Sequence, residues 1–314
     1  MFTILGAGGA ISNELSKVLA ENKIPFTLVS RHPVSIYGAA TKVADLTSAS
    51  QTNEAVRGSS VVVLCPGLPY DIRVWTKQWP AIMANAIEAC EEHNARLIFF
   101  DNVYMLGKVN GPMNEETPVH PTSKKGELRA KIAEQLMDEI KAGNLYAMIA
   151  RAADFYGPDC KTGFLNALIF DKMIVGKRSQ WLINDNVVHS YTFTPDCGRA
   201  LYLLSQSESA WNQVWHMPTA APPLTGKELI DLAAGIFNAS PRHTVIGKGM
   251  ISIAGIFNRL MYELKEMLYQ NDSTYIFDSS KFNKAFNFIP TSYEEGFKIV
   301  AASYTNTNYK KNLA

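Results

Sequence analysis

The sequence has almost no net charge. Its 30 Lys and Arg residues stand against 29 Asp and Glu residues, which gives a formal charge of +1 at pH 7. Nucleic acids and anionic membrane surfaces attract proteins with a marked basic excess, so we expect neither as a partner. The sequence also lacks any apolar run near the ~20 residues that a membrane-spanning helix needs. These absences leave chemistry on a small-molecule substrate as the default expectation.

Cysteine and histidine are scarce as well. The four cysteines and six histidines are scattered along the chain, and no two cysteines form a Cys-x-x-Cys pair. This spacing predicts no structural metal site, and it fits a reducing, cytoplasmic compartment. No leader peptide is expected, because the first strand begins at residue 2. Internal repeats and low-complexity stretches do not occur in the sequence, and residues 306–314 are predicted to be a polar tail.

What the sequence does have is a strand, a glycine-rich turn and a helix at its start. Residues 2–5 are apolar enough for a short buried strand, and residues 11–20 repeat apolar side chains at helical spacing. A strand followed by glycines and then by a helix is the context of a dinucleotide-binding turn. The segment therefore predicts a nucleotide cofactor.

The residues of this turn have separate uses. Gly6 would let the chain turn tightly after the strand, and Gly9 would let the backbone approach a pyrophosphate. The helix that follows offers the free N–H groups of its first turn to the phosphates. Ser12 stands where a third glycine is usual, and a small side chain is tolerable there because that position governs helix–strand packing. We therefore assign the phosphates of the cofactor to Gly6, Gly8, Gly9, Ala10 and Ile11.

The end of the second predicted strand, residues 26–30, bears on which dinucleotide is bound. An acidic residue there would bind the ribose hydroxyls of NAD, whereas an arginine suits the 2′-phosphate of NADP. The chain has Ser30 and Arg31 at this place and no acid. We therefore expect NADP(H) as the cofactor, with NAD less favoured.

Strands and helices continue to alternate as far as residue 151. This alternation predicts an α/β fold with a Rossmann-type doubly wound parallel sheet. Ligands bind outside the carboxyl ends of the strands in such a sheet, and Cys65, Pro66 and Gly67 follow the fourth strand directly. We therefore expect these three residues to contact the cofactor, together with Asn102 after the fifth strand. The further strands are expected at residues 41–46, 59–65, 96–101 and 145–151, and the helices at residues 79–93 and 127–141.

The regular alternation of strands and helices ends after residue 151. Residues 1–151, with residues 187–205 returning to them, are expected to form the NAD(P)-binding domain. Residues 152–186 and 206–305 would form a smaller C-terminal lobe, the usual place for a substrate pocket. The loop at residues 70–79 would help to shape this pocket. The aromatic side chains expected to line it are Tyr104, Phe155, Tyr156 and Trp181.

Several stretches together resemble the extended short-chain dehydrogenase/reductase family, the group of NAD(P)-dependent epimerases and dehydratases. They are Gly6–Ser12, Asp45-Leu46, Val62–Cys65, Arg151–Pro158 and His189–Ala200, and they span nearly the whole chain. The resemblance implies that Asp45 and Leu46 read the adenine. It also implies an oxidoreductase or epimerase/dehydratase that acts on a small polar substrate, commonly a nucleotide-sugar. A homodimer through the helices at 79–93 and 127–141 is typical of the family.

The catalytic pattern of the family is not preserved. The family places a Ser near the end of its fifth strand and a Tyr-x-x-x-Lys on the next helix, where the Tyr moves the proton and the Lys lowers its pKa. Here the Ser position holds Asn102. With Glu134 as the anchor, the Tyr and Lys positions hold Gly126 and Ala130. A shift by one residue brings Lys131 into the Lys position and still supplies no tyrosine.

One hypothesis is an enzyme with a displaced acid. Tyr104 would give the proton, Asn102 would hold the substrate oxygen, and Lys125 (or Lys124) would supply the missing ammonium. Tyr104 and Asn102 are two residues apart, so their side chains point the same way if the strand stays extended. A nearby cation is needed because the pKa of a tyrosine must fall from ~10 toward neutrality.

Two other hypotheses remain open. The chain could be a non-catalytic NADP(H)-binding redox sensor or regulatory module, with the Met-, Ile- and Phe-rich residues 246–268 as the contact face for a partner protein. Alternatively, the cofactor or the substrate itself could supply the reacting groups, so that no protein acid is needed.

Overall fold

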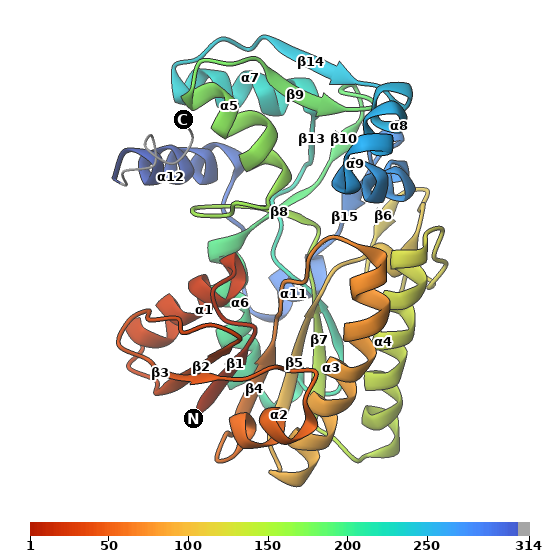
Figure 1. Cartoon of the computed structure of the whole chain (residues 1–314). Helices are drawn as coiled ribbons and strands as arrows, with labels where there is room; N and C mark the ends of the chain where they lie inside the picture. The colour runs from red at the N-terminus through yellow and green to blue at the C-terminus, as the bar shows by residue number, and fades with distance from the viewer. Residues whose placement is uncertain (307–314) are drawn as a thin grey trace. The chain divides into compact units, whose positions relative to one another are not determined.

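The computed structural model describes residues 1–306, and they divide into two compact units (Figure 1). Unit 1 contains residues 1–107, 118–152 and 197–217, and unit 2 contains residues 108–117, 153–196 and those from 218 onward. This division does not show what either unit binds, so the roles assigned to the two parts stay predictions. Of the predicted tail at 306–314, only Asn306, the last residue of a helix, is among the described residues.

Seven strands of unit 1 form one sheet. They are β1 (Phe2–Leu5), β2 (Phe26–Ser30), β3 (Ala40–Val43), β4 (Val61–Leu64), β5 (Arg96–Asp101), β7 (Ala147–Arg151) and β12 (Val214–His216). Their order is β12-β7-β5-β4-β1-β2-β3, and every neighbouring pair is parallel. β4 is buried along its whole length, as expected for a strand covered on both faces. The predicted doubly wound α/β sheet is confirmed, and its order reverses between β1 and β4, where such sheets bind ligands.

Helices cover both faces of this sheet (Figure 1). α2, α3 and α4 pack side by side in that order. α1 packs closely on α6, where a Cβ atom on Gly198 would lie 2.7 Å from the backbone carbon of Glu14. The bounds are α1 (Ala10–Glu21), α2 (Ala49–Val56), α3 (Ile72–Glu92), α4 (Lys124–Ala142) and α6 (Thr194–Gln206), with short 3₁₀ turns η1 (Tyr104–Leu106) and η3 (Glu208–Ala210).

Several boundaries differ from the predicted ones, among them the end of β3 and the start of α3. β3 ends at Val43 rather than at residue 46, because Asp45 begins a turn in which its Oδ1 accepts the backbone N–H of Thr47 at 2.9 Å. α3 begins at Ile72 rather than at residue 79, because the carboxylate of Asp71 caps it by accepting the backbone N–H of Arg73 at 2.9 Å. Most of the predicted loop at 70–79 is therefore helix.

Unit 2 is built from short elements around an aromatic core. Tyr156 and Trp181 are fully buried in that core, so they support the fold and do not line a pocket as predicted. The strands are β6 (Pro112–Met113), β8 (Asp154–Tyr156), β9 (Ser179–Leu182), β10 (Val188–His189), β11 (Tyr191–Phe193), β13 (Leu224–Thr225), β14 (His243–Ile246) and β15 (Ile276–Phe277). The helices are η2 (Asn166–Phe170), α5 (Asp171–Ile174), α7 (Gly226–Phe237), α8 (Lys248–Phe257), α9 (Arg259–Leu264), η4 (Lys265–Met267), α10 (Tyr269–Asp272), α11 (Ser280–Ala285) and α12 (Tyr293–Asn306).

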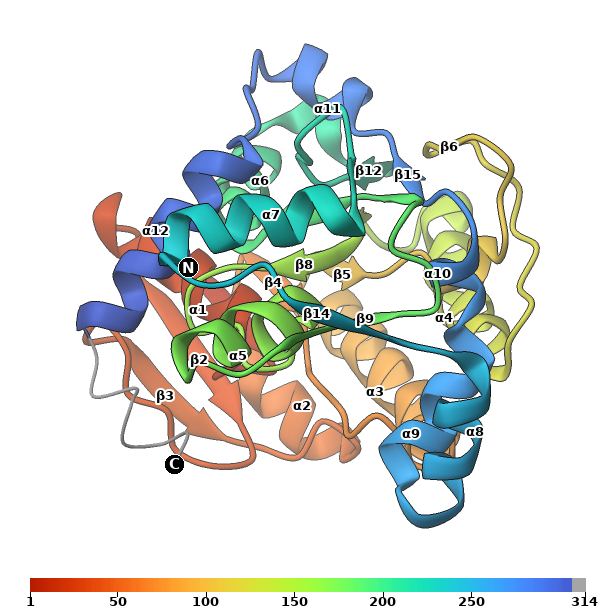
Figure 2. The same ribbon diagram turned by 90° about the horizontal axis from the view of Figure 1, so that it is seen from above.

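The Met- and Ile-rich segment forms the hairpin of α8 and α9 (Figure 2). Ile251 packs in a small cluster with Leu182 and Leu268, whereas Ile256 is 73% exposed and Phe257 87% exposed. The hairpin therefore leaves an apolar face in solvent. Across residues 1–306, the structure contains no helix that is long and apolar enough to cross a membrane.

Candidate functional site

The glycine-rich loop after β1 is held against the loop after β4. Gly6 has a φ of +97°, and a Cβ atom there would lie 2.3 Å from the backbone Cα of Pro66. Both facts exclude any side chain at this position, since the backbones approach too closely and the conformation is left-handed. Gly6 therefore serves the fold itself, by joining the two loops at the reversal point of the sheet.

Gly9 is different, because the fold leaves it open. It precedes α1 with an ordinary extended conformation (φ −89°), and a Cβ atom there would meet nothing within 4 Å. No side chain caps the helix at this end, so the N–H groups of its first turn point outward without an intrahelical partner. An anion is stabilised at such a helix end by these donors and by the helix dipole.

Ser12, which replaces the usual third glycine, ties the loop together. Its Oγ accepts the backbone N–H of Gly8 at 2.9 Å and donates to the carbonyl oxygen of Gly9 at 2.8 Å. The side chain is buried, so these bonds are shielded from water. Ser12 thus fixes the shape of the loop that Gly8 and Gly9 form.

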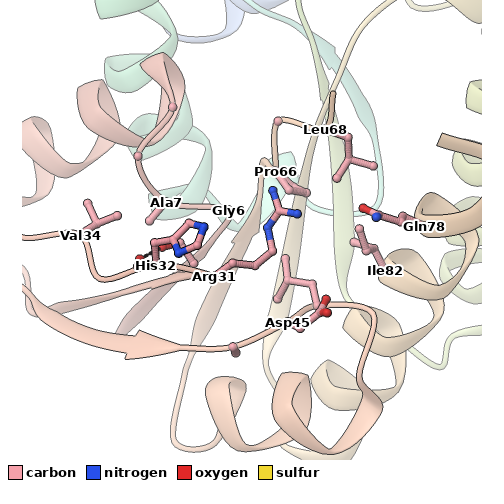
Figure 3. A pocket seen from close by; sticks show the side chains of 16 residues that line it. Gly6, Ala7, Arg31, His32, Val34, Asp45, Pro66, Leu68, Gln78 and Ile82 are labelled. Atoms are coloured by element: carbon pink, nitrogen blue, oxygen red, sulfur yellow. Dashed lines mark hydrogen bonds between the residues drawn. The ribbon is translucent and has the colours of Figure 1, made fainter. Parts of the chain in front are cut away.

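A cavity of about 340 Å³ opens at this loop, within unit 1 (Figure 3). It extends from the glycines across the ends of β2 and β4 to α3. Four predicted cofactor residues, Ala10, Ile11, Cys65 and Asn102, do not line it, whereas the other nine do. The lining residues are Gly6, Ala7, Gly8, Gly9, Ser30, Arg31, His32, Val34, Ala44, Asp45, Leu46, Pro66, Gly67, Leu68, Gln78 and Ile82.

Charged groups face this cavity after the ends of β2 and β3. The guanidinium of Arg31 points into the space between Asp45 and Pro66 (Figure 3). Hydrogen bonds from the backbone and side chain of Thr47 lower the pKa of Asp45, and the charge of Arg31 lowers it further. Asp45 is therefore a carboxylate at neutral pH, so the cavity offers one cation and one hydrogen-bond acceptor near each other.

The end of β4 contributes backbone rather than a reactive side chain. Burial raises the pKa of the Cys65 thiol to about 12. The thiol therefore stays protonated at neutral pH and is a poor nucleophile. Pro66 and Gly67, which follow it, form part of the cavity wall.

Two of the predicted catalytic residues, Asn102 and Tyr104, lie beyond the end of β5, also in unit 1. Asn102 uses its side-chain Oδ1 to accept the backbone N–H of Tyr104 at 3.0 Å. This bond starts the 3₁₀ turn η1 at Tyr104, so the strand does not stay extended. The alternation by which Asn102 and Tyr104 would point the same way does not apply, and this part of the prediction is wrong.

The first turns of α4 carry two buried cations on one stripe. Lys125 is 0% exposed and Arg129 is 3% exposed, four residues apart. Gly126 accepts no side chain, because a Cβ atom there would lie 2.5 Å from the carbonyl oxygen of Tyr104. Lys125 and Arg129 are thus the two inward-facing residues that have the spacing of the family's Tyr-x-x-x-Lys. They lie one residue before Gly126 and Ala130, the positions that the anchor at Glu134 gives.

The side chain of Arg129 is held by contacts within unit 1. It forms a buried ion pair with Asp101, in which its Nε donates to Oδ1 at 2.7 Å. Its guanidinium lies 4.3 Å from the ring centroid of Trp79 and 4.9 Å from that of Phe99. Arg129 therefore fastens α4 to the end of β5.

Lys125 meets an aromatic cluster formed by Tyr70, Trp75 and Tyr104. Its Nζ lies 4.7 Å from the ring centroid of Tyr70. The ring centroids of Tyr70 and Trp75 are 5.6 Å apart, and those of Trp75 and Tyr104 are 6.4 Å apart in a stacked arrangement. Sequence reasoning missed Tyr70 and Asp101, although the four-residue spacing of Lys125 and Arg129 was a readable signal.

One family model matches most of the chain. The model of the NAD dependent epimerase/dehydratase family matches residues 2–214. A search of curated protein sequences gives no match.

Solved structures resemble the chain over its full length. A UDP-glucose 4-epimerase from Thermotoga maritima, solved with UDP-glucose, has a TM-score of 0.81 at 17% identity, with 100% of both chains covered. A dTDP-glucose 4,6-dehydratase double mutant from Streptomyces venezuelae, solved with NAD, has a TM-score of 0.81 at 14% identity, again with 100% of both chains covered. A UDP-glucose 4-epimerase from Thermus thermophilus, solved with NAD, has a TM-score of 0.80 at 15% identity, with 98% of this chain and 100% of that chain covered. At these identities the likeness concerns the fold.

Proposed function

Because the chain belongs to the NAD-dependent epimerase/dehydratase family, we propose that it binds a nicotinamide dinucleotide in the cavity at the glycine-rich loop. We propose further that it uses this cofactor to oxidise, reduce, epimerise or dehydrate a small polar substrate. The open space at Gly9, in front of the uncapped N-terminus of α1, is the observation that carries the proposal.

The residues present fit such a cofactor. The N–H groups of the first turn of α1, which begins directly after Gly9 of the cavity lining, would hold the pyrophosphate. The Asp45 carboxylate and the edge of Leu46 line the cavity where the adenine would lie, with Asp45 as the acceptor for its amino group. A bound nicotinamide supplies hydride transfer, and the protein then has to position the substrate and move a proton.

The proposed substrate class is the nucleotide-sugars. The relatives described above are named for UDP-glucose and dTDP-glucose, and this chain shares their fold. Within this class, Asn102 would hold the substrate oxygen through its amide Nδ2, because its Oδ1 is already engaged with Tyr104. The proton would come from a tyrosine beside Lys125, and Tyr104 is the one that the sequence predicts.

Arg31 carries the finer proposal about the cofactor. Two of the relatives were solved with NAD, yet this chain has Arg31 and His32 where β2 ends, and both line the cavity. A guanidinium there would bind the 2′-phosphate of NADP(H), since arginine binds phosphate with charge-assisted hydrogen bonds. The alternative cofactor, NAD, needs no partner for Arg31.

Titration of the protein with NADPH and with NADH tests the proposed binding of the 2′-phosphate by Arg31. The fluorescence of the five tryptophans reports binding in each titration. We expect Arg31→Asp to weaken NADPH binding by about 1.5–3 kcal/mol, roughly 10- to 100-fold, and to affect NADH far less. Arg57→Asp is the matched control, because Arg57 is exposed on unit 1 and its partner is Glu54, outside the cavity. Equal losses for both dinucleotides would remove the 2′-phosphate from the proposal.

A non-catalytic NADP(H)-binding module is the second candidate. The observation in its favour is that the inward stripe of α4 carries Lys125 and Arg129 in place of a tyrosine and a lysine. Incubation with NAD or NADP and UDP-glucose separates the two candidates, with the nicotinamide absorbance followed during the reaction and the sugar nucleotides analysed after it. Tight binding without turnover across such a screen would favour the regulatory module.

A further inference from the structure

The helix α8 of unit 2 has the composition of a buried helix, but only one of its sides is buried. Its sequence contains no charged residue after Lys248, and Ser252 is its one hydroxyl-bearing residue. Ile251 and Gly255, four residues apart, form the buried side. A helix that is apolar all round is normally covered on every side, by protein or by lipid. The outer side of α8 therefore exposes to solvent a surface whose composition suits a covered position.

This exposed surface is centred on the turn between α8 and α9. Met250, Ile253 and Phe257 follow one another at spacings of three and four residues, so they lie on one side of α8. Exposure rises along the helix from 57% at Met250 to 87% at Phe257, next to the turn (Figure 2). The exposed apolar residues of the two helices, called the hairpin patch below, are Met250, Ile253, Ile256, Phe257, Leu260 and Tyr262.

The exposed charges beside the hairpin patch are cations. Residues 241–265 contain four Lys and Arg residues, all exposed, and one acid, Glu263, which is buried. The next acids along the chain, Glu266 and Asp272, are half-buried, and Asp272 pairs with Lys248. The net charge of +1 averages over the whole chain. Around the hairpin, the surface itself presents positive charge to solvent.

We propose that the hairpin patch docks the protein on the surface of an anionic lipid bilayer. The apolar side chains at the turn enter the boundary between headgroups and acyl chains, and Lys248, Arg259 and Lys265 lie at the level of the lipid phosphates. Apolar side chains flanked by cations are typical of helices that lie in the plane of a membrane surface and do not cross it. This docking goes beyond the proposed dinucleotide function and does not depend on it.

Two features favour a bilayer over a second protein chain as the cover of the patch. A stable protein interface buries about 800 Å² on each partner and involves roughly 20–30 residues of each. The hairpin patch has six apolar residues on two short helices. Its most exposed residue, Phe257, lies next to the turn, so the patch is a projection rather than a flat face. Fluid acyl chains adapt to a projecting side chain, whereas a protein partner would need a matching groove.

Binding of the full chain to lipid vesicles tests the proposal. Vesicles of phosphatidylcholine and phosphatidylglycerol, mixed two to one, are compared with vesicles of pure phosphatidylcholine in a flotation assay at physiological ionic strength. We expect the wild type to float with the mixed vesicles. Binding to the pure phosphatidylcholine vesicles should be several-fold weaker, because their surface carries no net negative charge to attract the cations.

Substitution at the turn locates the contact. Phe257→Ser should lower the affinity for the mixed vesicles at least about tenfold, because the phenyl group no longer enters the apolar layer. Ile289→Ser is the matched control, since Ile289 is also 87% exposed and lies in unit 2 outside the hairpin. Its affinity should equal that of the wild type. Both residues are exposed, so both variants should keep the unfolding temperature of the wild type.

Substitution of a cation tests the role of the anionic headgroups. Lys265→Gln should weaken binding to the mixed vesicles about fivefold, because one attraction to the negatively charged surface is lost. Lys141→Gln is the matched control, since Lys141 is an exposed lysine of α4 in unit 1. Its affinity should not change.

A tryptophan placed at the turn reports the insertion directly. The five native tryptophans are all buried, so the change in emission on adding vesicles comes from the new one. The emission of Phe257→Trp should shift to shorter wavelength with the mixed vesicles, because the indole passes from water into the apolar layer. The emission of Ile289→Trp should not shift.

Several results would overturn the proposal. One is a wild type that does not float with the mixed vesicles, and another is an equal loss of binding in Phe257→Ser and Ile289→Ser. A wild type that forms dimers, is monomeric as Phe257→Ser and ignores vesicles would assign the patch to a second copy of the chain. A monomeric wild type that ignores vesicles would leave a different protein as the cover.

NADPH affinity separates this inference from the proposed function. Phe257 does not line the cavity at the glycine-rich loop, so Phe257→Ser should bind NADPH as the wild type does. A protein that floats with the mixed vesicles and binds neither dinucleotide would contradict the proposed function alone. A protein that binds NADPH and ignores the vesicles would contradict the bilayer docking alone.

Discussion

Two regions of unit 1 differ in how they relate to the family's pattern. At the glycine-rich loop, the chain keeps small residues and leaves the N-terminus of α1 uncapped. At the first turns of α4, it fills the inward positions with Lys125 and Arg129, which contact aromatic rings. One region is open and the other is packed.

In the proposed function, dinucleotide binding and proton transfer therefore depend on separate parts of this chain. The binding device rests mainly on backbone groups, so it persists when side chains elsewhere change. Proton transfer depends on one acid with a suitable pKa, which can move to another element if a cation faces it there. Each part can therefore be disabled without the other, and the predictions below exploit this.

The largest effect is expected at Arg129, and it concerns stability rather than binding. Arg129→Met leaves the buried carboxylate of Asp101 without a counter-ion, which should cost about 3–5 kcal/mol. Urea unfolding measures the loss. At urea concentrations well below the unfolding transition, the affinity of the variant for NADPH should equal that of the wild type, because Arg129 does not line the cavity.

Two variants control for this result. Arg57→Met removes an exposed ion pair with Glu54 and should cost less than about 1 kcal/mol. The double variant Asp101→Leu/Arg129→Met should recover part of the loss, because no charge is left unpaired. A single variant as stable as the wild type would show that the pair does not fasten α4.

Gly9→Val should prevent dinucleotide binding at the glycine-rich loop and leave the stability of the fold unchanged. A valine Cβ at this position meets no protein atom within 4 Å, but it blocks the approach of a pyrophosphate. We expect affinity for both dinucleotides to fall at least about 100-fold, about 2.8 kcal/mol, with an unchanged unfolding midpoint.

Gly6→Ala is the opposite case and serves as the contrast. Its Cβ would lie 2.3 Å from the Pro66 backbone, so the thermal unfolding temperature itself should fall. If Gly9→Val lowered that temperature as much as Gly6→Ala does, the binding loss would no longer point to a ligand at Gly9.

The smallest effect is expected at Ser12. Ser12→Ala removes the two hydrogen bonds that hold Gly8 and Gly9, so the loop loses part of its preorganisation. NADPH binding should weaken by about 0.5–1.5 kcal/mol, roughly two- to tenfold, in calorimetric titration. Ser16→Ala is the control, because Ser16 bonds within α1 and lies outside the cavity. Equal NADPH affinities of the wild type and Ser12→Ala would show that the hydrogen bonds of Ser12 do not preorganise the loop for binding.

The sequence predicts most of the fold because apolar runs mark the central strands. β1, β2 and β5 have the predicted bounds, as each is a short apolar segment followed by a turn. α3 was misplaced because a proline inside a helix argues against helix upstream of it, and Pro80 lies eight residues inside this one. The cap at Asp71 outweighs that local signal.

The region proposed for catalysis was less predictable for a physical reason. Tyr70 and Lys125 are far apart in sequence, and only the packing of α3 against α4 brings them together. The turn at Tyr104 depends on one side-chain bond from Asn102, which no period in the sequence reveals. The glycine-rich loop needs neither kind of long-range information, since its parts are consecutive.

The residue found at position 9 after selection would show whether folding or ligand binding requires glycine there. The folded protein has room for a side chain there, whereas at Gly6 it has none. In a library of random variants selected only for folding, position 9 should drift to other residues while position 6 stays glycine. A second selection, for survival on dinucleotide binding, should restore glycine at position 9. The difference between the two libraries would measure how strongly a ligand, rather than the fold, constrains this residue.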